Sequence, residues 1–149
     1  MNWDYLAGFF DGEGNLHTGF IKNKQACQLR IRIYSTNQGV LEQIKEFLGD
    51  KGYIYTKKAS RNDPNRNLVY EFVILKKEDC LLFLKNIYPY SIIKKEQITY
   101  LLENFDFSRG NRAGGHNNLH FDIDKFRSFN TRKNTNNSIK NHTIKSLTE

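Results

Sequence analysis

The sequence predicts an α+β fold in which helices cover one face of a four-stranded antiparallel sheet. Two patterns lead to this class. Segments with apolar residues at every second position, typical of half-buried strands, occur along the chain in two pairs. Each pair follows a segment whose apolar residues recur at helical spacing, and two more such segments follow the second pair. The expected order is helix, two strands, helix, two strands and two helices.

A first helix is expected from Trp3 onward. Its apolar stripe has helical spacing and consists of Trp3, Leu6, Ala7 and Phe10. Gly8 and Gly12 lie one turn apart on an adjoining stripe, where another backbone can approach very closely. Asp11 and Glu13 fall in the last turn, where the helix dipole makes each anion cost about 0.3–1 kcal/mol. We therefore expect a cation beside this end of the helix.

The first strand pair comprises Asn15 to Ile21 and Gln28 to Tyr34. The second of these strands alternates cleanly, with Leu29, Ile31 and Ile33 on one side and polar residues on the other. The helix after it has apolar residues at i, i+1, i+4, i+7 and i+8, namely Val40, Leu41, Ile44, Phe47 and Leu48. Two glycines directly beyond mark its end.

A second strand pair, Tyr53 to Ala59 and Leu68 to Leu75, flanks the turn-rich Arg61 to Asn67, which suits a hairpin tip. Two helices separated by Pro89 then follow. Their apolar residues in register are Leu81, Leu84, Ile87 and Tyr88 in the first and Ile98, Leu101, Leu102 and Phe105 in the second. A less regular extension beyond them contains a short helix near Asp122 to Phe129.

The chain divides accordingly into residues 1–107, an α+β core, and residues 108–149, a basic and partly irregular extension. From Ser108 onward eight Lys or Arg residues stand against three acidic ones, and Asn130 to Asn141 is rich in Asn, Ser and Thr. Such a segment suits a loosely ordered arm that lies along phosphates. A merely solvated tail is the open alternative.

Composition limits the class of protein. At 149 residues, with 38% hydrophobic and 13% aromatic content, the chain fits one domain with a real core. Its net charge of +7 and pI near 9.4 favour a polyanionic partner, although basicity alone would suit RNA or an anionic membrane. With no apolar run near ~20 residues and no signal peptide, a soluble, unsecreted protein without a membrane partner is expected. Cys27 and Cys80 match no zinc spacing and are expected as reduced, lightly buried thiols.

The run Leu6 to Gly14, LAGFFDGEG, resembles the defining motif of the LAGLIDADG homing endonucleases. The matching positions are Leu6, Ala7, Gly8, Asp11 and Gly14, with Phe9, Phe10, Gly12 and Glu13 as ordinary variants. A core helix with a glycine C-cap would show a similar pattern. An EF-hand fails, because Leu16 stands where that loop needs glycine and Lys22 where it needs glutamate. A dinucleotide fingerprint fails because His17 stands where a third glycine is needed.

The resemblance covers Met1 to about Phe107 and implies the αββαββα core of that family. There the motif helix packs against its counterpart across a twofold axis, and a chain with one motif acts as a homodimer on a nearly palindromic target. The residues that the resemblance places at the dimer interface are Leu6, Ala7, Gly8, Asp11 and Gly12. Asp11 is expected to cap and position the helix ends rather than to ligate metal.

The resemblance also implies which residues bind the metal ion and take part in catalysis. The final acid of the motif, here Glu13, binds the divalent cation with help from the Gly12 carbonyl. Mg²⁺ is expected, with Mn²⁺ as a substitute and Ca²⁺ binding without cleavage. Lys94, which follows a proline and an apolar pair, aligns with the lysine that activates water or neutralises charge, and Lys95 is the alternative.

Two further polar residues are assigned beside these. Asn37 aligns with the residue that orients the metal-bound water, a task that Gln38 can share, and a helix N-cap is the competing interpretation of Asn37. Ser91 is expected as the N-cap of the last core helix. Lys94 would then occupy its N3 position, where a capping box prefers Glu.

The outward face of the sheet is expected to read double-stranded DNA in the major groove. Arg binds guanine bidentately and Gln or Asn binds adenine, so a ribbon that carries both suits base recognition. The residues expected on this face are Asn15, His17, Gly19, Gln28, Arg30, Arg32, Tyr34, Tyr55 and Lys57, with Glu71 left open. An ordinary solvent-facing sheet is the alternative.

Together these features predict a site-specific, metal-dependent endonuclease that hydrolyses both strands of a long, nearly palindromic DNA and is encoded within an intron. An RNA maturase that assists group I intron splicing is the main alternative, and a transcription regulator without catalysis is a third. The intact Glu13 and Lys94 favour the nuclease. An organelle or a prokaryotic cytoplasm is the expected compartment.

Overall fold

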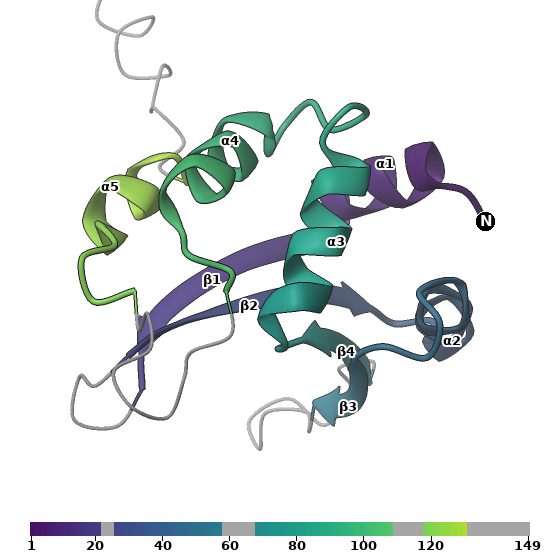
Figure 1. The fold of residues 1–149 in the computed structure, drawn as a ribbon. Coiled ribbons are helices and arrows are strands. Elements are labelled where there is room, and N and C mark those ends of the chain that lie inside the picture. The colour runs from purple at the N-terminus through teal and green to yellow at the C-terminus, as the bar shows by residue number, and fades with distance from the viewer. Residues whose placement is uncertain (22–25, 58–67, 109–117, 131–149) are drawn as a thin grey trace, which may run out of the picture.

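The structure, a computed structural model, describes residues 1–21, 26–57, 68–108 and 118–130 (Figure 1). The elements in these ranges are α1 (Trp3–Glu13), β1 (Gly14–Phe20), β2 (Cys27–Ser35), α2 (Gln38–Phe47), β3 (Tyr53–Lys57), β4 (Val69–Ile74), α3 (Lys77–Ile87), α4 (Lys95–Asn104) and α5 (Ile123–Ser128). The predicted α+β class and the predicted order of elements are confirmed. The hairpin tip expected at Arg61 to Asn67 and the arm beyond residue 130 lie outside the described residues.

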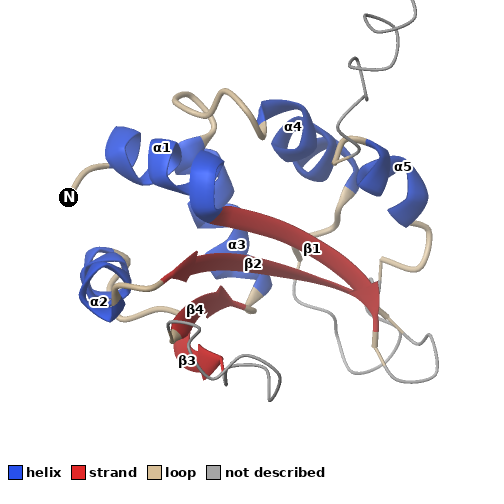
Figure 2. Cartoon of the chain, turned by 180° about the vertical axis from the view of Figure 1, so that it is seen from behind, coloured by secondary structure: helices blue, strands red, loops and turns tan. Residues whose placement is uncertain are grey.

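The strands form one antiparallel sheet in the order β1-β2-β4-β3. The two hairpins therefore meet through β2 and β4, where Ile33 pairs with Phe72. Figure 2 shows α1, α3, α4 and α5 on one side of this curved sheet and α2 at one end of it. The opposite face of the sheet carries no helix within the described part of the chain.

Strand periodicity decides which face is buried. On β2 the exposed fractions of Leu29, Ile31 and Ile33 are 3%, 0% and 0%, whereas Arg30 between them is exposed. Leu16 and Thr18 of β1 point to the same covered side. The predicted alternation is confirmed, and each buried Leu or Ile contributes about 1.5–3 kcal/mol to folding.

The motif helix α1 is packed into the core along the stripe that its spacing predicts. Leu6, Ala7 and Phe10 are fully buried. The Phe10 ring meets the Phe83 ring of α3 edge to face, with centroids 5.1 Å apart, and Trp3 meets the Phe47 ring of α2 at 5.0 Å. Through these ring contacts α1 packs against both α2 and α3.

The segment after residue 107 shares the core of the preceding residues. Phe121, Ile123 and Phe126 belong to the same buried cluster as Phe10, and Tyr100 of α4 stacks near them. Part of the predicted extension thus contributes to the core, and its predicted short helix is present as α5. The sequence did not show which face of α5 is buried, because the helix is too short for helical periodicity to appear.

The Asn118 side chain joins this extension to the backbone just after α4 by hydrogen bonds. Asn118 is 1% exposed and has a positive φ of 53°, a conformation that Asn tolerates better than most residues. Its Oδ1 accepts from the Asp106 N–H at 2.6 Å, and its Nδ2 donates to the Asp106 carbonyl at 2.9 Å. This pair of hydrogen bonds fixes where the chain re-enters the core.

Two remaining expectations concern the cysteines and membranes. Cys27 and Cys80 are free thiols, but both are deeply rather than lightly buried, and burial raises the pKa of the Cys80 thiol to about 12. None of the described helices is long and apolar enough to cross a bilayer.

Candidate functional site

The C-terminal end of α1, which we call the α1 tip, comprises Asp11, Gly12 and Glu13. The chain passes from helix to strand with no intervening loop, since β1 begins at Gly14. A Cβ at Gly14 would overlap the Phe10 ring and the Phe10 carbonyl. Glycine is therefore needed for the chain to turn here so tightly, and the turn leaves Gly12 and Glu13 exposed.

Asp11 is the buried member of the α1 tip, with an exposed fraction of 8%. Its Oδ1 accepts from Ser91 Oγ at 2.6 Å and from the Lys94 N–H at 3.2 Å. Its Oδ2 accepts from the Ile92 and Ile93 N–H groups at 2.7 and 3.0 Å. Burial alone would raise the pKa of the Asp11 carboxyl, but these hydrogen bonds outweigh it and hold that pKa below its usual 3.8.

This arrangement corrects the assignment of Ser91 as a helix N-cap. The helix α4 begins at Lys95, and its N-cap residue, Lys94, makes no side-chain capping bond. The Asp11 carboxylate reaches across from α1 and accepts from the backbone N–H groups just before α4, while Ser91 donates its hydroxyl to that carboxylate. A cap supplied by another helix leaves no local pattern in the sequence.

Lys94 supplies the cation that the acidic α1 tip needs. Its Nζ donates to the Asp11 carbonyl at 2.6 Å and lies 5.5 Å from the centre of the Phe10 ring. Burial lowers the pKa of the Lys94 ammonium, and the Asp11 and Glu13 carboxylates partly oppose that shift. Lys95 turns elsewhere, with its Nζ 4.9 Å above the Tyr88 ring. Of the two predicted lysines, only Lys94 lies at the α1 tip.

A cleft of about 460 Å³ opens beside this lysine, and we call it the tip cleft. Its lining residues are Asp11, Gly12, Gly14, Ile93, Lys94, Gln97, Phe129 and Asn130. The walls therefore come from α1, from the start of α4 and from the end of α5. Gln97, Phe129 and Asn130 were not predicted, because their place beside the motif depends on how α4 and α5 pack.

The α1 tip also contains the predicted metal ligands. In the ranges that the structure describes, no three side chains of His, Cys, Asp or Glu come together. Mg²⁺, however, is commonly held by one or two carboxylates together with substrate phosphates and water. The exposed Glu13 carboxylate and the Gly12 carbonyl fit that donor set.

Asn37 caps α2. Its Oδ1 accepts from the Val40 N–H at 3.3 Å, and its own N–H donates to Ser35 Oγ at 3.0 Å. Gln38 donates from Nε2 to Glu42 at 3.0 Å. Neither residue lines the tip cleft. The structure thus shows the competing interpretation of Asn37, the helix cap, and the role of Asn37 in orienting water stays a prediction.

The open face of the sheet carries the predicted polar residues. Strand register pairs Asn15 with Arg32 and His17 with Arg30, so their side chains share this face. Glu71, which the sequence left open, lies on it too, opposite both Tyr34 and Tyr55. That these residues share one face is confirmed; that they read DNA stays a prediction.

Contacts within this face hold two of its arginine side chains in place. Arg30 donates from Nε and Nη2 to Gln28 Oε1 at 3.2 Å, and Arg32 Nε lies 3.4 Å from Glu71 Oε1. Burial lowers the pKa of the His17 imidazole, and the nearby Arg32 and Arg30 charges lower it further. His17 is therefore a neutral ring at physiological pH, able both to donate and to accept a hydrogen bond.

The exposed surface of α1 differs from the predicted interface set. Leu6 and Ala7 are fully buried inside their own chain, and Asp11 is held by Ser91, so none of these presents its side chain outward. Gly8 and Gly12 are exposed, with no atom within 4 Å of an added Cβ. The stripe through these glycines, which we call the outer stripe, consists of Tyr5, Gly8, Phe9 and Gly12. Tyr5 is half exposed and its ring stacks on Phe9.

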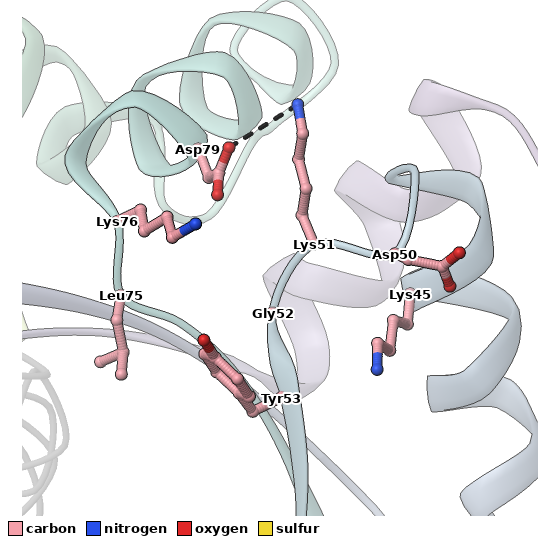
Figure 3. A pocket seen from close by; sticks show the side chains of 8 residues that line it. All are labelled: Lys45, Asp50, Lys51, Gly52, Tyr53, Leu75, Lys76 and Asp79. Carbon is pink, nitrogen blue, oxygen red and sulfur yellow. Dashed lines mark ion pairs between the residues drawn. The ribbon is translucent and has the colours of Figure 1, made fainter.

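Another pocket, of about 200 Å³, lies away from the motif between α2, β3 and α3 (Figure 3). Its lining includes Lys45, Lys51 and Lys76, and Lys51 Nζ lies 3.6 Å from Asp79 Oδ1. None of the predicted site residues lines it. The tip cleft is therefore the concave site that belongs to the motif.

The α1 tip thus combines a buried capping acid, Asp11, with an exposed glutamate, Glu13, and lies beside the open face of the sheet. The chain matches the family described as LAGLIDADG-like domain over residues 3–88. It therefore belongs to the LAGLIDADG family. No curated protein sequence shows a significant match to it.

Solved structures with the same fold support this placement. The homing endonuclease I-CvuI in complex with its target is 19% identical with a TM-score of 0.54, over 68% of this chain and 63% of that one. The meganuclease I-AabMI bound to uncleaved DNA is 23% identical with a TM-score of 0.53, over 70% and 38%. The archaeal intron-encoded homing endonuclease I-Vdi141I complexed with DNA is 19% identical with a TM-score of 0.56, over 86% and 96%.

These likenesses concern the fold. The chain spans less than two thirds of the length of I-CvuI and of I-AabMI, and nearly all of I-Vdi141I.

Proposed function

We propose that this protein is a site-specific DNA endonuclease that hydrolyses phosphodiester bonds with a divalent cation. The observation that carries the proposal is the α1 tip: an exposed carboxylate, Glu13, stands beside a half-buried cation, Lys94, at the edge of a cleft. The fold is that of proteins solved as homing endonucleases on DNA. Duplex DNA is the polyanion that the net charge of +7 favours.

Glu13 and the Gly12 carbonyl would hold the cation, for which Mg²⁺ is the proposed ion. The chemistry that such a cation supplies when bound is charge neutralisation on the scissile phosphate and activation of water. Lys94 adds a fixed positive charge in the tip cleft, since its Nζ is anchored on the Asp11 carbonyl. Asp11 keeps the α1 tip and the start of α4 together, so that Glu13 and Lys94 stay close during the reaction.

The proposed assembly is a homodimer on a nearly palindromic target. The outer stripe of α1 offers two open glycines one turn apart, which allow two helix backbones to approach closely. Two copies related by a twofold axis would bring two Glu13 carboxylates together, one for each DNA strand. The open sheet faces would then lie on either side of the cut. We propose that the reading frame lies within an intron, as that of I-Vdi141I does by its description.

The test uses a duplex selected by the protein itself from a randomised library in the presence of Ca²⁺. The wild-type protein should bind that duplex and cut both strands when Mg²⁺ replaces Ca²⁺. The Glu13→Gln variant should bind it equally well and leave it intact, because the amide cannot replace the anionic ligand. Glu103→Gln, which removes an exposed carboxylate at the far end of α4, is the matched control and should cut normally.

The result also separates the proposal from the maturase alternative. If the wild-type protein bound structured intron RNA and promoted splicing, but cut no DNA that it bound, the nuclease proposal would be wrong. Cleavage by the Glu13→Gln variant would instead leave the nuclease and overturn the assignment of its acid.

A further inference from the structure

Gln97 is a polar side chain buried beside the α1 tip with an unused donor. It is the third residue of α4 and is 4% exposed. Its Nε2 is buried and has no hydrogen-bond partner among the described residues. A buried amide donor without a partner costs stability, and native proteins keep few of them, commonly at sites that a water or ligand completes.

The position of Gln97 points to the kind of ligand. Gln97 lines the tip cleft with Lys94, which precedes it by three residues and so lies on the same helical face. Both residues stand at the N-terminal end of α4, where the helix dipole is positive. Asn130, just beyond α5, adds a further polar group to the lining. Three of the lining side chains, those of Lys94, Gln97 and Asn130, thus carry hydrogen-bond donors.

The Asp11 carboxylate that also lines the cleft balances the Lys94 charge, but its oxygens are not free acceptors. Both oxygens of Asp11 already accept two hydrogen bonds each, from Ser91 and Lys94 on one side and from Ile92 and Ile93 on the other. The amide of Gln97 is thus left free to meet an incoming oxygen anion.

We propose that Gln97 is a phosphate-binding residue of the nuclease: its Nε2–H donates to a non-bridging phosphate oxygen of the DNA strand that enters the tip cleft, beside the Lys94 ammonium. This inference rests on the proposed function. Lys94 brings the charge and Gln97 a directional hydrogen bond, which together orient the phosphate relative to Glu13. No bond is made or broken at Gln97, and its contribution is to hold the phosphate as negative charge develops on it.

The first experiment compares Gln97→Leu and Gln97→Glu with the wild-type protein on the selected duplex. The Leu variant should slow single-turnover cleavage by about 10²-fold, the size expected when one transition-state donor is removed. The dissociation constant in Ca²⁺ should change much less, because many other contacts hold the duplex. The Glu variant should be slower still, since it places a carboxylate against the phosphate. Gln43→Leu, on an exposed face of α2, is the matched control.

Two readouts separate contact from a structural effect. The melting temperature of Gln97→Leu should stay at or above that of the wild-type protein, because the substitution removes a buried donor that lacks a partner. Methylphosphonate groups, placed one at a time along the cut strand, should slow the wild-type enzyme strongly at one phosphate. At that same phosphate they should slow Gln97→Leu little further, as expected for two groups in contact.

Each outcome decides a specific point. If the wild-type protein cuts the duplex and Gln97→Leu cuts it at the same rate, this inference is wrong and the proposed function stands. Equal methylphosphonate profiles for the two proteins would also overturn it. If Gln97→Leu folds poorly, Gln97→Glu and Gln97→Met give the same comparison. If the wild-type protein cuts no DNA, the proposed function fails and this inference fails with it.

Discussion

The Ser91 hydroxyl lies 2.6 Å from Asp11 Oδ1 and so joins the last turn of α1 to the segment that leads into α4. The same carboxylate accepts hydrogen bonds from the backbone N–H groups of Ile92, Ile93 and Lys94. One side chain thus replaces the local cap that α4 lacks and fixes where Lys94 stands. The first acid of the motif is a structural cap in this chain, whereas the last acid, Glu13, is exposed.

Asp11→Asn should therefore destabilise the protein strongly. The amide keeps the shape but turns an NH₂ group toward backbone N–H donors, so at least one of those donors loses its partner. We expect a loss of about 2–3 kcal/mol in the free energy of unfolding, measured by urea denaturation. Asp4→Asn, on the exposed first turn of the same helix, is the control and should cost well under half as much. Equal losses in the two variants would contradict the capping role.

The same carboxylate predicts a specific dependence of stability on pH. Hydrogen bonds from Ser91 and its neighbours hold the pKa of Asp11 below 3.8, more than offsetting the burial that would raise it. A group whose pKa is lower in the folded state stabilises the fold above its unfolded pKa, and that contribution is lost as pH falls through the folded pKa. The difference in free energy of unfolding between wild-type protein and Asp11→Asn should hence be constant near neutral pH and shrink below about pH 4. A difference independent of pH would contradict this account.

Lys94 and Lys95 are adjacent in sequence but should differ sharply in function. Lys94 Nζ is bound to the Asp11 carbonyl in the tip cleft, whereas Lys95 Nζ lies over the Tyr88 ring. Lys94→Met should slow single-turnover cleavage by about 10²–10⁴-fold, the range for loss of a general acid–base or charge-stabilising group. Lys95→Met removes the same charge and should stay near the wild-type rate. Similar losses in both would mean that net charge, rather than position, matters.

How far the sequence predicts this molecule depends on the range of the interactions. The strands and helices follow from local periodicity, which is why Leu29, Ile31 and Ile33 were placed correctly on one face of β2. The cap of α4 and the tip cleft depend on contacts between residues far apart in the chain. Asp11 and Ser91 are one such pair, and Gln97 and Asn130 line one cleft only because α5 packs against α4. Helical spacing likewise predicted Leu6 and Ala7 as a stripe without deciding whether that stripe faces the core or a partner.

Glu71 should limit how tightly the open sheet face binds DNA. Its carboxylate pairs with Arg32 at 3.4 Å and lies opposite Tyr55 on that face. Glu71→Gln removes a charge that repels phosphate and releases Arg32 to contact the duplex. We expect affinity to rise by up to about fivefold, since such pairs are worth about 0.2–1 kcal/mol. Fluorescence anisotropy at fixed salt measures it, with Glu103→Gln as the matched charge change away from the sheet. An unchanged affinity for Glu71→Gln would place this part of the sheet outside the DNA contact.

Gly8 gives the sharpest test of the proposed dimer, because its two expected effects have opposite signs. An added Cβ at Gly8 meets no atom within 4 Å in the single chain, so Gly8→Ala should stabilise α1 by about 0.5–1 kcal/mol in dilute protein. If two copies pack their outer stripes together, the same methyl group pushes the helix backbones apart and weakens dimerisation. Sedimentation equilibrium should therefore show a raised dimer dissociation constant for Gly8→Ala and a monomer for Gly8→Leu. Glu103→Leu places the same side chain at the exposed far end of α4 and should leave the dimer intact. A dimer of unchanged strength in Gly8→Leu would show that the copies meet elsewhere, and the two Glu13 carboxylates would then lack the shared axis that cutting both strands at one site requires.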